Sequence, residues 1–215
     1  MAEAVALPRT LVVTAVEAEA EAVRLGAGDG ALHVLAGGVG PAAAAAATAA
    51  ALASGPYDLI ISAGIGGGFA GIAPVGSLVV ADEIVAADLG AETPDGFVPV
   101  TELGFGTVRH EPPRQLAAGV ARATDGTLGT ILTVSTVTGT AARAEALREA
   151  HPRAAAEAME GFGVAEAAAR AGVPVLELRA ISNPVGPRDR EAWRIKDALT
   201  ALTSAFEALP AALRA

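Results

Sequence analysis

The sequence predicts an α/β fold in which helices cover most of a central β-sheet. Two observations indicate this fold class. Short apolar runs rich in β-branched residues, typical of strands, alternate along the chain with alanine-rich segments typical of helices. The chain has 215 residues, of which 52% are hydrophobic, so it can bury a sizeable core. This length fits a single domain over residues 1–215 better than two domains.

The first half of the chain is rich in predicted strands. They are TLVVTAV (10–16), ALHVLAGG (31–38), DLIISAG (58–64) and GSLVVADEIV (76–85). The acidic stretch after the first strand has the composition of a helix start. The segment PAAAAAATAAALASG predicts a helix over 41–53, where alanine allows close packing against its neighbours.

The second half begins with a segment of different character. Residues 86–126 are rich in Pro, Gly and Thr and weakly periodic, which predicts a long loop or an excursion that covers a ligand. Strands are then predicted over 127–136 and 173–182, and helices over 140–152 and 156–172, the latter closed by a glycine and a proline. A last helix is predicted over 189–209, with Asp189 as its N-cap.

The composition excludes several classes of function. The formal net charge is −9, and no basic cluster is interleaved with aromatic residues, so nucleic-acid binding is not expected. Cysteine is absent and only 3 histidines are present, so we expect neither a metal nor another cofactor. There is neither a secretory leader nor an apolar run of about 18 to 20 residues, which predicts a soluble, cytoplasmic protein with no membrane partner.

Distinctive residues stand where four predicted strands end. The motifs are TAVEAEAEA (14–22), AGGVGP (36–41), SAGIGGGFAG (62–71) and RAISNPVG (179–186). Glycine-rich turns let backbone amides approach a ligand closely, and ligands of α/β sheets bind at the carboxyl ends of strands. Each motif alone is weak evidence, because tight turns also need glycine. GIGGGFAG lacks both the dinucleotide-binding spacing and the Lys and Ser/Thr of a P-loop.

Taken together and in order, the motifs resemble the nucleoside phosphorylase and nucleosidase superfamily, in the branch of methylthioadenosine/adenosylhomocysteine nucleosidases and futalosine hydrolases. Further landmarks are VGSLVVADEIVAADLG, TVSTVTGT and AMEGFGVA, so the resemblance covers nearly the whole chain. It implies a three-layer α/β/α domain around a mixed, twisted sheet, commonly as a homodimer. It also implies a small-molecule nucleoside substrate whose N-glycosidic bond is cleaved.

The resemblance assigns the acidic residues. Cleavage of an N-glycosidic bond builds positive charge on the ribose, and a water molecule must reach the anomeric carbon. Glu19 matches the glutamate that activates this water in the family, with Glu17 and Glu21 as rivals because the alternating spacing blurs the match. The alternative is that these acids only favour the helix dipole. Glu160 matches the glutamate that binds the ribose hydroxyls, and Met159 the residue that packs on the sugar.

Other residues are expected to complete the pocket. The backbone amides of Gly66 and Gly67 are candidate base contacts. Ile65 stands where some nucleosidases carry a serine, so the hydroxyl of Thr136 or Thr138 could replace that contact. No arginine occurs in the first three strand-end loops, and carboxylates there would repel phosphate. Hydrolysis is therefore favoured over phosphorolysis, and Arg143 is the residue that could overturn this argument by entering the pocket.

Asn183 is the most informative departure from the adenosine-type nucleosidases, which carry an aspartate there. An amide offers an NH₂ donor and a carbonyl acceptor. The donor suits O6 of a 6-oxopurine, whereas the 6-amino group of adenine would leave an unmatched polar pair that costs about 1 to 3 kcal/mol. We therefore expect Asn183 to be a catalytic residue that contacts the purine, and its amide favours release of hypoxanthine over adenine. The alternative is that it caps the turn before Pro184.

The stretch SNPVGPRDREAW is most similar to futalosine hydrolases, whose substrate carries a carboxyphenyl-ketone tail on C5′ and belongs to menaquinone biosynthesis. An acidic protein must meet this carboxylate with arginines placed locally. Arg188 and Arg190 are the expected cations, among the nearby arginines that also include Arg179 and Arg194, with Trp193 or Phe162 flanking the ring. Three alternatives stay open: a methylthioadenosine, adenosylhomocysteine or aminofutalosine nucleosidase, a purine nucleoside phosphorylase, and a nucleoside-binding module without catalysis.

Overall fold

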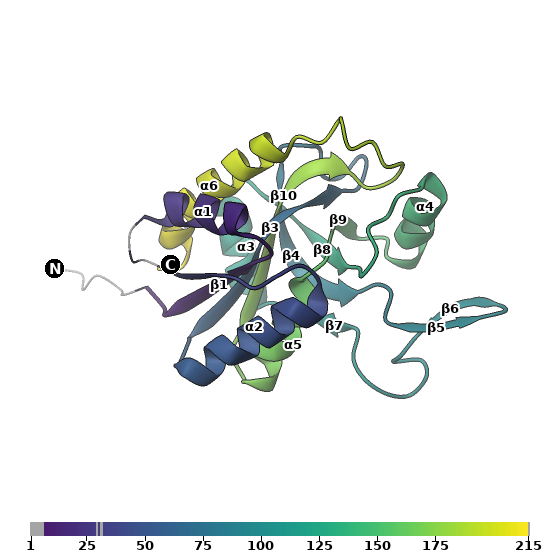
Figure 1. The fold of residues 1–215 in the computed structure, drawn as a ribbon, viewed down its shortest axis with the longest axis horizontal. Helices are drawn as coiled ribbons and strands as arrows, with labels where there is room; N and C mark the ends of the chain where they lie inside the picture. Colours follow the sequence, from purple (N-terminus) through teal and green to yellow (C-terminus); the bar gives the residue numbers. More distant parts are fainter. Residues whose placement is uncertain (1–6, 29, 31, 215) are drawn as a thin grey trace.

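A computed structural model describes residues 7–28, 30 and 32–214 (Figure 1). The centre is an eight-stranded mixed sheet in the order β10-β4-β8-β9-β3-β1-β2, with β7 beside β4. Its strands are β1 (Thr10–Thr14), β2 (His33–Ala36), β3 (Leu59–Gly68), β4 (Leu78–Ala86), β7 (Arg109–His110), β8 (Thr127–Thr133), β9 (Ala154–Ala158) and β10 (Val175–Pro184).

The sheet curls back on itself because β10 pairs with both β4 and β3. The strands β3, β10, β4, β8 and β9 therefore pair in a closed circuit, and β1 and β2 extend it from β3. Strands β1, β3 and β10 run parallel to one another, so their carboxyl ends meet at the same edge. This edge is where a ligand site is expected in an α/β sheet.

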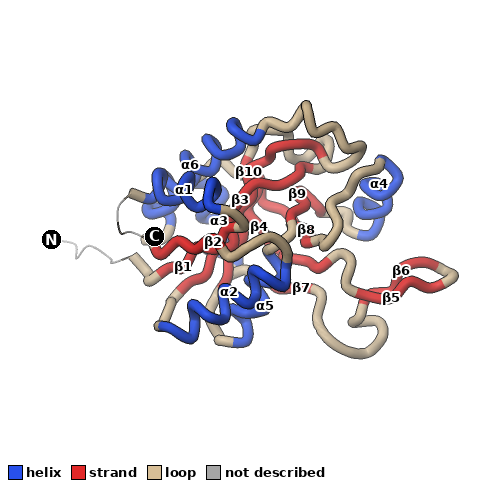
Figure 2. Tube along the Cα trace, in the orientation of Figure 1, coloured by secondary structure: helices blue, strands red, loops and turns tan. Residues whose placement is uncertain are grey.

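Helices cover both faces of the sheet (Figures 1 and 2). They are α1 (Glu17–Ala27), α2 (Pro41–Ser54), α3 (Arg114–Ala123), α4 (Ala141–Ala150), α5 (Gly161–Arg170) and α6 (Ile195–Ala212). Helices α1, α3 and α6 lie on one face, and α2 and α5 lie on the other. This arrangement confirms the α/β/α layers around a mixed sheet.

The two faces of the sheet have separate cores because successive side chains of a strand point to opposite sides. Ile60 packs in the core beneath α2 and α5, whereas Ile61 packs beneath α1 and α6 with Phe206. A close approach joins α2 and α5, since a Cβ at Gly163 would overlap the Pro41 carbonyl. The small side chains predicted to allow close packing are thus found where these two helices meet.

Two predicted helices begin later than the sequence suggested. Residues 156–158 belong to β9, which pairs with β8 and β3, so helix α5 starts only at Gly161. Helix α6 begins at Ile195 with Arg194 as its N-cap, and Asp189 instead accepts hydrogen bonds from the backbone of Glu191 and Ala192. The prediction of Asp189 as the helix cap is therefore wrong, because the chain before Arg194 forms a loop over the sheet edge.

The segment 86–126 contains more regular structure than was predicted. It includes β7, helix α3 and a hairpin of β5 (Gly90–Thr93) and β6 (Gly96–Pro99). The hairpin projects away from the sheet (Figure 2). Within the part of the chain that the structure describes, no helix is both long and apolar enough to cross a membrane.

Candidate active site

A cavity of about 320 Å³ opens at the carboxyl ends of β1, β3 and β10. Its walls come from segments that are distant in sequence. They are the β1–α1 turn (Ala15, Val16, Glu19), Val39, the end of β3 (Ile65, Gly66, Gly67), Val137, the β9–α5 junction (Glu157, Ala158, Met159, Glu160), the end of β10 (Ser182, Asn183), and Arg188 and Trp193. All the strand-end motifs identified in the sequence contribute to this lining.

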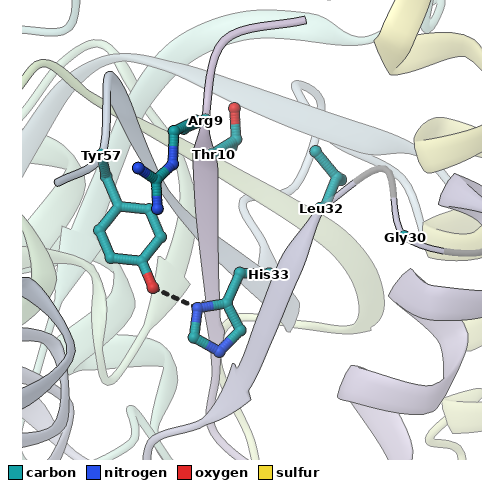
Figure 3. A pocket seen from close by; sticks show the side chains of 6 residues that line it. All are labelled: Arg9, Thr10, Gly30, Leu32, His33 and Tyr57. Carbon is teal, nitrogen blue, oxygen red and sulfur yellow. Dashed lines mark hydrogen bonds between the residues drawn. The ribbon is translucent and has the colours of Figure 1, made fainter. Parts of the chain in front are cut away.

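A larger hollow of about 430 Å³ lies at the opposite, amino-terminal ends of β1 and β2 (Figure 3). There the Tyr57 hydroxyl is hydrogen bonded to a ring nitrogen of His33, and the Arg9 side chain lies beside them. Among the described residues that line it, none carries a carboxylate. It therefore lacks the acidic groups that the predicted chemistry requires, whereas the smaller cavity has them.

The Glu19 carboxylate is held rigidly at the wall of the cavity. Its Oε1 accepts a hydrogen bond from the backbone N–H of Ile65 at 2.9 Å. Its Oε2 accepts from the N–H groups of Ala15 and Val16 at 3.0 and 3.2 Å. Glu19 is 3% exposed. A carboxylate with these donors has lone pairs to spare for a water molecule.

The two rivals of Glu19 lie on the surface. Glu17 pairs with Arg24 across one face of α1, and Glu21 is exposed on the same helix. Helix α1 starts in this acidic turn, so its successive side chains point in different directions. Among the three acids, only Glu19, the third residue of the helix, lines the cavity. The structure thus separates three acids that the sequence could not.

Glu160 lines the same cavity as Glu19 and is the N-cap of α5. Its Oε1 accepts a hydrogen bond from Gly40 N–H at 3.1 Å, and its Oε2 accepts one from Arg179 Nη1 at 3.2 Å. Arg179 is 1% exposed, and its Nη2 donates to Ser62. Burial disfavours the charged guanidinium, but Glu177, Glu160 and Glu19 together raise the pKa of Arg179. Arg179 is therefore a buried cation that aligns carboxylates, and it is not free to bind an anionic substrate.

Glu177 lies behind Arg179 on β10 and is fully buried. Burial raises the pKa of its carboxyl to about 7, although Arg179 Nε donates to its Oε1 at 2.9 Å. Its Oε2 has no hydrogen-bond partner among the described residues and lies against Gly161, where a Cβ would overlap it. Glycine is thus required at the first position of α5, because the ion pair lies directly beneath the helix.

Asn183 and Ser182 stand together at the end of β10. The Ser182 hydroxyl lies 2.8 Å from Asn183 Oδ1, to which it donates. Asn183 Nδ2 donates to the Pro184 carbonyl at 3.0 Å. The amide therefore has a fixed orientation, with one N–H and one lone pair remaining. Asn183 is 9% exposed and lines the cavity, so the same side chain both contacts the Pro184 turn and forms part of the cavity wall.

Glu157 on β9 is a cavity acid that the sequence analysis did not single out. Its Oε1 accepts a hydrogen bond from Thr138 N–H at 2.9 Å, and its Oε2 accepts one from the Thr138 hydroxyl. Burial raises the pKa of the Glu157 carboxyl, and these two hydrogen bonds work in the opposite direction. The Thr138 hydroxyl is thus bonded to a side chain of the protein.

The structure brings some of the predicted site residues together and leaves others outside. Gly66, Gly67, Met159 and Arg188 line the cavity, and Trp193 lies beside Arg188 with its ring 5.2 Å from the guanidinium carbon. Other residues named from the sequence do not line it: Thr138 is hydrogen bonded to Glu157, Thr136 and Arg190 are exposed, Phe162 lies in a separate groove against the His110 ring, and Arg143 is on the surface of α4.

The arrangement of charges limits what this cavity can do. Three buried carboxylates, those of Glu19, Glu157 and Glu160, line it, and the one cation on its described lining is Arg188. Such a site stabilises positive charge on a substrate and can accept a proton from water, but it does not concentrate cations around an inorganic phosphate. Among the described residues, no group of three or more His, Asp or Glu is placed to hold a metal ion.

Comparisons with known proteins show the family and the fold of this chain. The family model of the phosphorylase superfamily matches residues 13–215. The futalosine hydrolase of Streptomyces coelicolor is 72% identical over 177 residues, which cover 80% of this chain and 75% of that protein. The futalosine hydrolase of Acidothermus cellulolyticus is 50% identical over 227 residues, which cover 95% of this chain and 91% of that protein. The 5′-methylthioadenosine/S-adenosylhomocysteine nucleosidase of Colwellia psychrerythraea, solved with adenine, aligns with a TM-score of 0.83 at 20% identity over 96% of both chains, which shows the shared fold.

Proposed function

The chain belongs to the futalosine hydrolase family of the phosphorylase superfamily, and from this premise we propose that it hydrolyses the N-glycosidic bond of futalosine. The products are hypoxanthine and dehypoxanthine futalosine, and the reaction belongs to menaquinone biosynthesis. One structural observation supports the proposal independently of sequence similarity. The buried Glu19 carboxylate, fixed by backbone donors, lines the same cavity as Glu160 and Asn183.

Glu19 acts as the general base. Water bound to its free lone pairs loses a proton to the carboxylate as it attacks the anomeric carbon. The N-glycosidic bond breaks at the same time, and its electron pair leaves with the base. Positive charge that develops on the ribose is stabilised by the nearby carboxylates, whose orientation is set before the substrate binds.

Glu160 binds the ribose, and Arg179 positions it. One carboxylate can accept protons from two adjacent hydroxyls, and the Gly40 and Arg179 contacts leave lone pairs for this role. Met159, beside Glu160 on the cavity wall, packs against the sugar. These contacts hold the anomeric carbon in a fixed position relative to Glu19. Holding the reacting groups in this geometry raises the rate of the reaction.

Asn183 holds the departing purine. Its remaining N–H donates to O6. Its Oδ1, oriented by Ser182, accepts a hydrogen bond from N7–H once the departing base has taken a proton from solvent at N7. Gly66 and Gly67 present bare backbone beneath the base because they carry no side chain. The negative charge that the base acquires on leaving is therefore met at O6 by the neutral N–H of Asn183.

Arg188 receives the carboxylate of the C5′ tail. It lies at the cavity rim against Trp193, and its backbone N–H donates to Gly139. We expect Arg188→Ala to raise the KM for futalosine about tenfold or more, because a hydrogen bond to a charged group contributes about 1.5–3 kcal/mol. Steady-state kinetics with futalosine and with inosine, which lacks the tail, checks this expectation. Arg190→Ala is the matched control, since Arg190 is on the same loop but outside the cavity. Equal losses for both substrates would contradict the assignment.

A homodimer is part of the same proposal. The hairpin region exposes large apolar side chains: Leu89, Phe97, Leu103 and Phe105, with Phe105 62% exposed. An apolar groove of about 310 Å³ between α2, α5 and Leu89 lies at the base of the hairpin. Exposed apolar patches of this kind mark interfaces. We expect analytical ultracentrifugation to show a dimer that the double variant Phe97→Ser/Phe105→Ser converts to monomer, and a monomeric wild type would contradict this.

One assay separates the proposed function from its alternatives. Purified protein is incubated with futalosine, aminofutalosine, methylthioadenosine or adenosylhomocysteine, with and without phosphate, and the released bases are separated. We expect hypoxanthine from futalosine at a rate that phosphate does not change. Strict dependence on phosphate would indicate a phosphorylase, release of adenine alone an adenine nucleosidase, and saturable binding without release a binding module.

A further inference from the structure

Glu177 is a buried carboxylate behind the cavity that takes no part in the proposed steps. It is fully buried on β10, and its Oε1 accepts a hydrogen bond from Arg179 Nε at 2.9 Å. Its Oε2 has no hydrogen-bond partner among the described residues. A buried carboxylate with an unpartnered oxygen lowers the stability of a fold, so its presence here calls for a functional explanation.

Glu177 fixes the orientation of the Arg179 guanidinium. The two residues are two positions apart on one strand, so their side chains leave it on the same face. Nη2 of the guanidinium donates to Ser62 at 2.8 Å, and Nη1 donates to Glu160 Oε2 at 3.2 Å. The guanidinium is a rigid, planar fork. Once Nε is bound to Glu177 and Nη2 to Ser62, the direction of Nη1 toward Glu160 is determined.

The same guanidinium also lies beside Glu19. Arg179 pairs with Gly64 in the ladder between β10 and β3. A Cβ at Gly64 would lie 2.6 Å from Glu19 Oε1 and 2.9 Å from Arg179 Nη1, so the two atoms approach the same point above this glycine. One buried cation therefore lies among three carboxylates. Two of them, Glu19 and Glu160, line the cavity, and Glu177 lies behind it.

We propose that Glu177 is a positioning residue for the two cavity carboxylates and acts on them through Arg179. Its Oε1 fixes the guanidinium, and its negative charge offsets the positive charge of the guanidinium. Without this offset, the charge of Arg179 would be met by Glu160 and Glu19 alone, and both would be weaker acceptors. This inference rests on the proposed function, because the carboxylates are needed for the positive charge that cleavage builds on the ribose.

The charge of Glu177 should affect the transition state more than the bound substrate. The ionised form adds one negative charge to the buried group around Arg179. Positive charge on the ribose is present only while the N-glycosidic bond breaks, and charges interact strongly in a buried environment. Ionised Glu177 is therefore expected to raise kcat and to leave KM nearly unchanged.

The protonation of Glu177 makes this effect depend on pH. Burial raises the pKa of its carboxyl to about 7, Arg179 on the same strand opposes the rise, and Glu160 at the start of α5 adds to it. On β3, the residue paired with Glu177 is the uncharged Ser62. The carboxyl is protonated below this pKa and ionised above it. We therefore expect kcat to increase as pH rises through about 7.

Single-turnover hydrolysis of futalosine by the wild type and Glu177→Gln, followed across pH, tests the proposal. Gln can still accept a hydrogen bond from Arg179 Nε, but it has no charge. We expect the rate constant of the wild type to rise about fivefold from pH 6 to pH 8. The variant should be about tenfold slower than the wild type at pH 8, similar to it at pH 6, and without an ionisation near 7. Glu207→Gln, an exposed acid on α6, is the control and should keep the wild-type profile.

A second measurement needs no turnover. Carboxyl NMR of the wild type with ¹³C-labelled glutamate side chains should show a signal that titrates with a midpoint of about 7. Glu177→Gln should lack this signal, and Glu207→Gln should retain it.

Two results would overturn the proposal. Absence of any glutamate that titrates near 7 in the wild type would do so without a variant. A rate profile in Glu177→Gln that is parallel to the wild-type profile would show that Glu177 only fills space behind Arg179. Failure of the proposed function gives a different result. If another nucleoside is cleaved and futalosine is not, the same pH comparison with that nucleoside decides the role of Glu177, because these substrates share the ribose.

Discussion

Replacement of Glu19 by Gln is expected to lower kcat for futalosine by about 10²- to 10⁴-fold, the usual contribution of a general base. Gln keeps the size of the side chain but cannot take a proton from water. Because only water activation is removed, the affinity for hypoxanthine should change little. Single-turnover kinetics and a binding titration measure the two effects separately.

Glu19 also contributes to the stability of the fold, so the unfolding free energy of Glu19→Gln must be measured together with its kcat. Its carboxylate accepts from three backbone N–H groups, those of Ala15, Val16 and Ile65, and an amide would place a donor against at least one of them. We expect a loss of about 1–3 kcal/mol in unfolding free energy. Glu21→Gln on the exposed face of α1 is the matched control and should alter neither stability nor kcat. Wild-type turnover in Glu19→Gln would exclude Glu19 as the base.

Asn183→Asp is expected to shift the preference between futalosine and aminofutalosine by about 10- to 100-fold toward the 6-amino substrate. The change replaces the NH₂ that donates to O6 with an oxygen that accepts from a 6-amino group. A mismatch of one buried polar pair costs about 1–3 kcal/mol, which sets this range. The ratio of kcat/KM for the two substrates is the measurement.

Ser182→Ala is the comparison for Asn183→Asp. It removes the hydroxyl that donates to Asn183 Oδ1 without changing the donors and acceptors that face the base. It should therefore lower kcat/KM for both substrates to a similar degree and leave the ratio of the two kcat/KM values near that of the wild type. If Asn183→Asp also leaves the ratio unchanged, the 6-position is read elsewhere in the pocket.

The fold class could be predicted because its signals are local. The β-branched runs at 10–16 and 58–64 became β1 and β3, since burial on both faces demands apolar side chains at every position. Local signals failed at β9. Its sequence AAAEA suits a helix as well as a strand, and only the gap between β8 and β3 determines which one forms. Glu157 was overlooked because it lies on this strand.

The ion-pair network behind the cavity could not be predicted for a related reason. Arg179 bonds to Ser62 and Glu160, which are far from it in the sequence and meet it only when β10 lies beside β3 and beneath α5. From the sequence, Arg179 was noted only as one of the arginines near Arg188 and Arg190, the expected cations for the substrate tail. Phe162 was misplaced similarly, because the start of α5 directs it toward His110 and away from the cavity.

Hydrolysis of futalosine in H₂¹⁸O tests most directly whether water attacks the anomeric carbon. The wild type in phosphate-free buffer should release hypoxanthine and leave one ¹⁸O atom on the anomeric carbon of dehypoxanthine futalosine, detected by mass spectrometry. Failure to release base without phosphate, or formation of the sugar product without the label, would exclude attack by water.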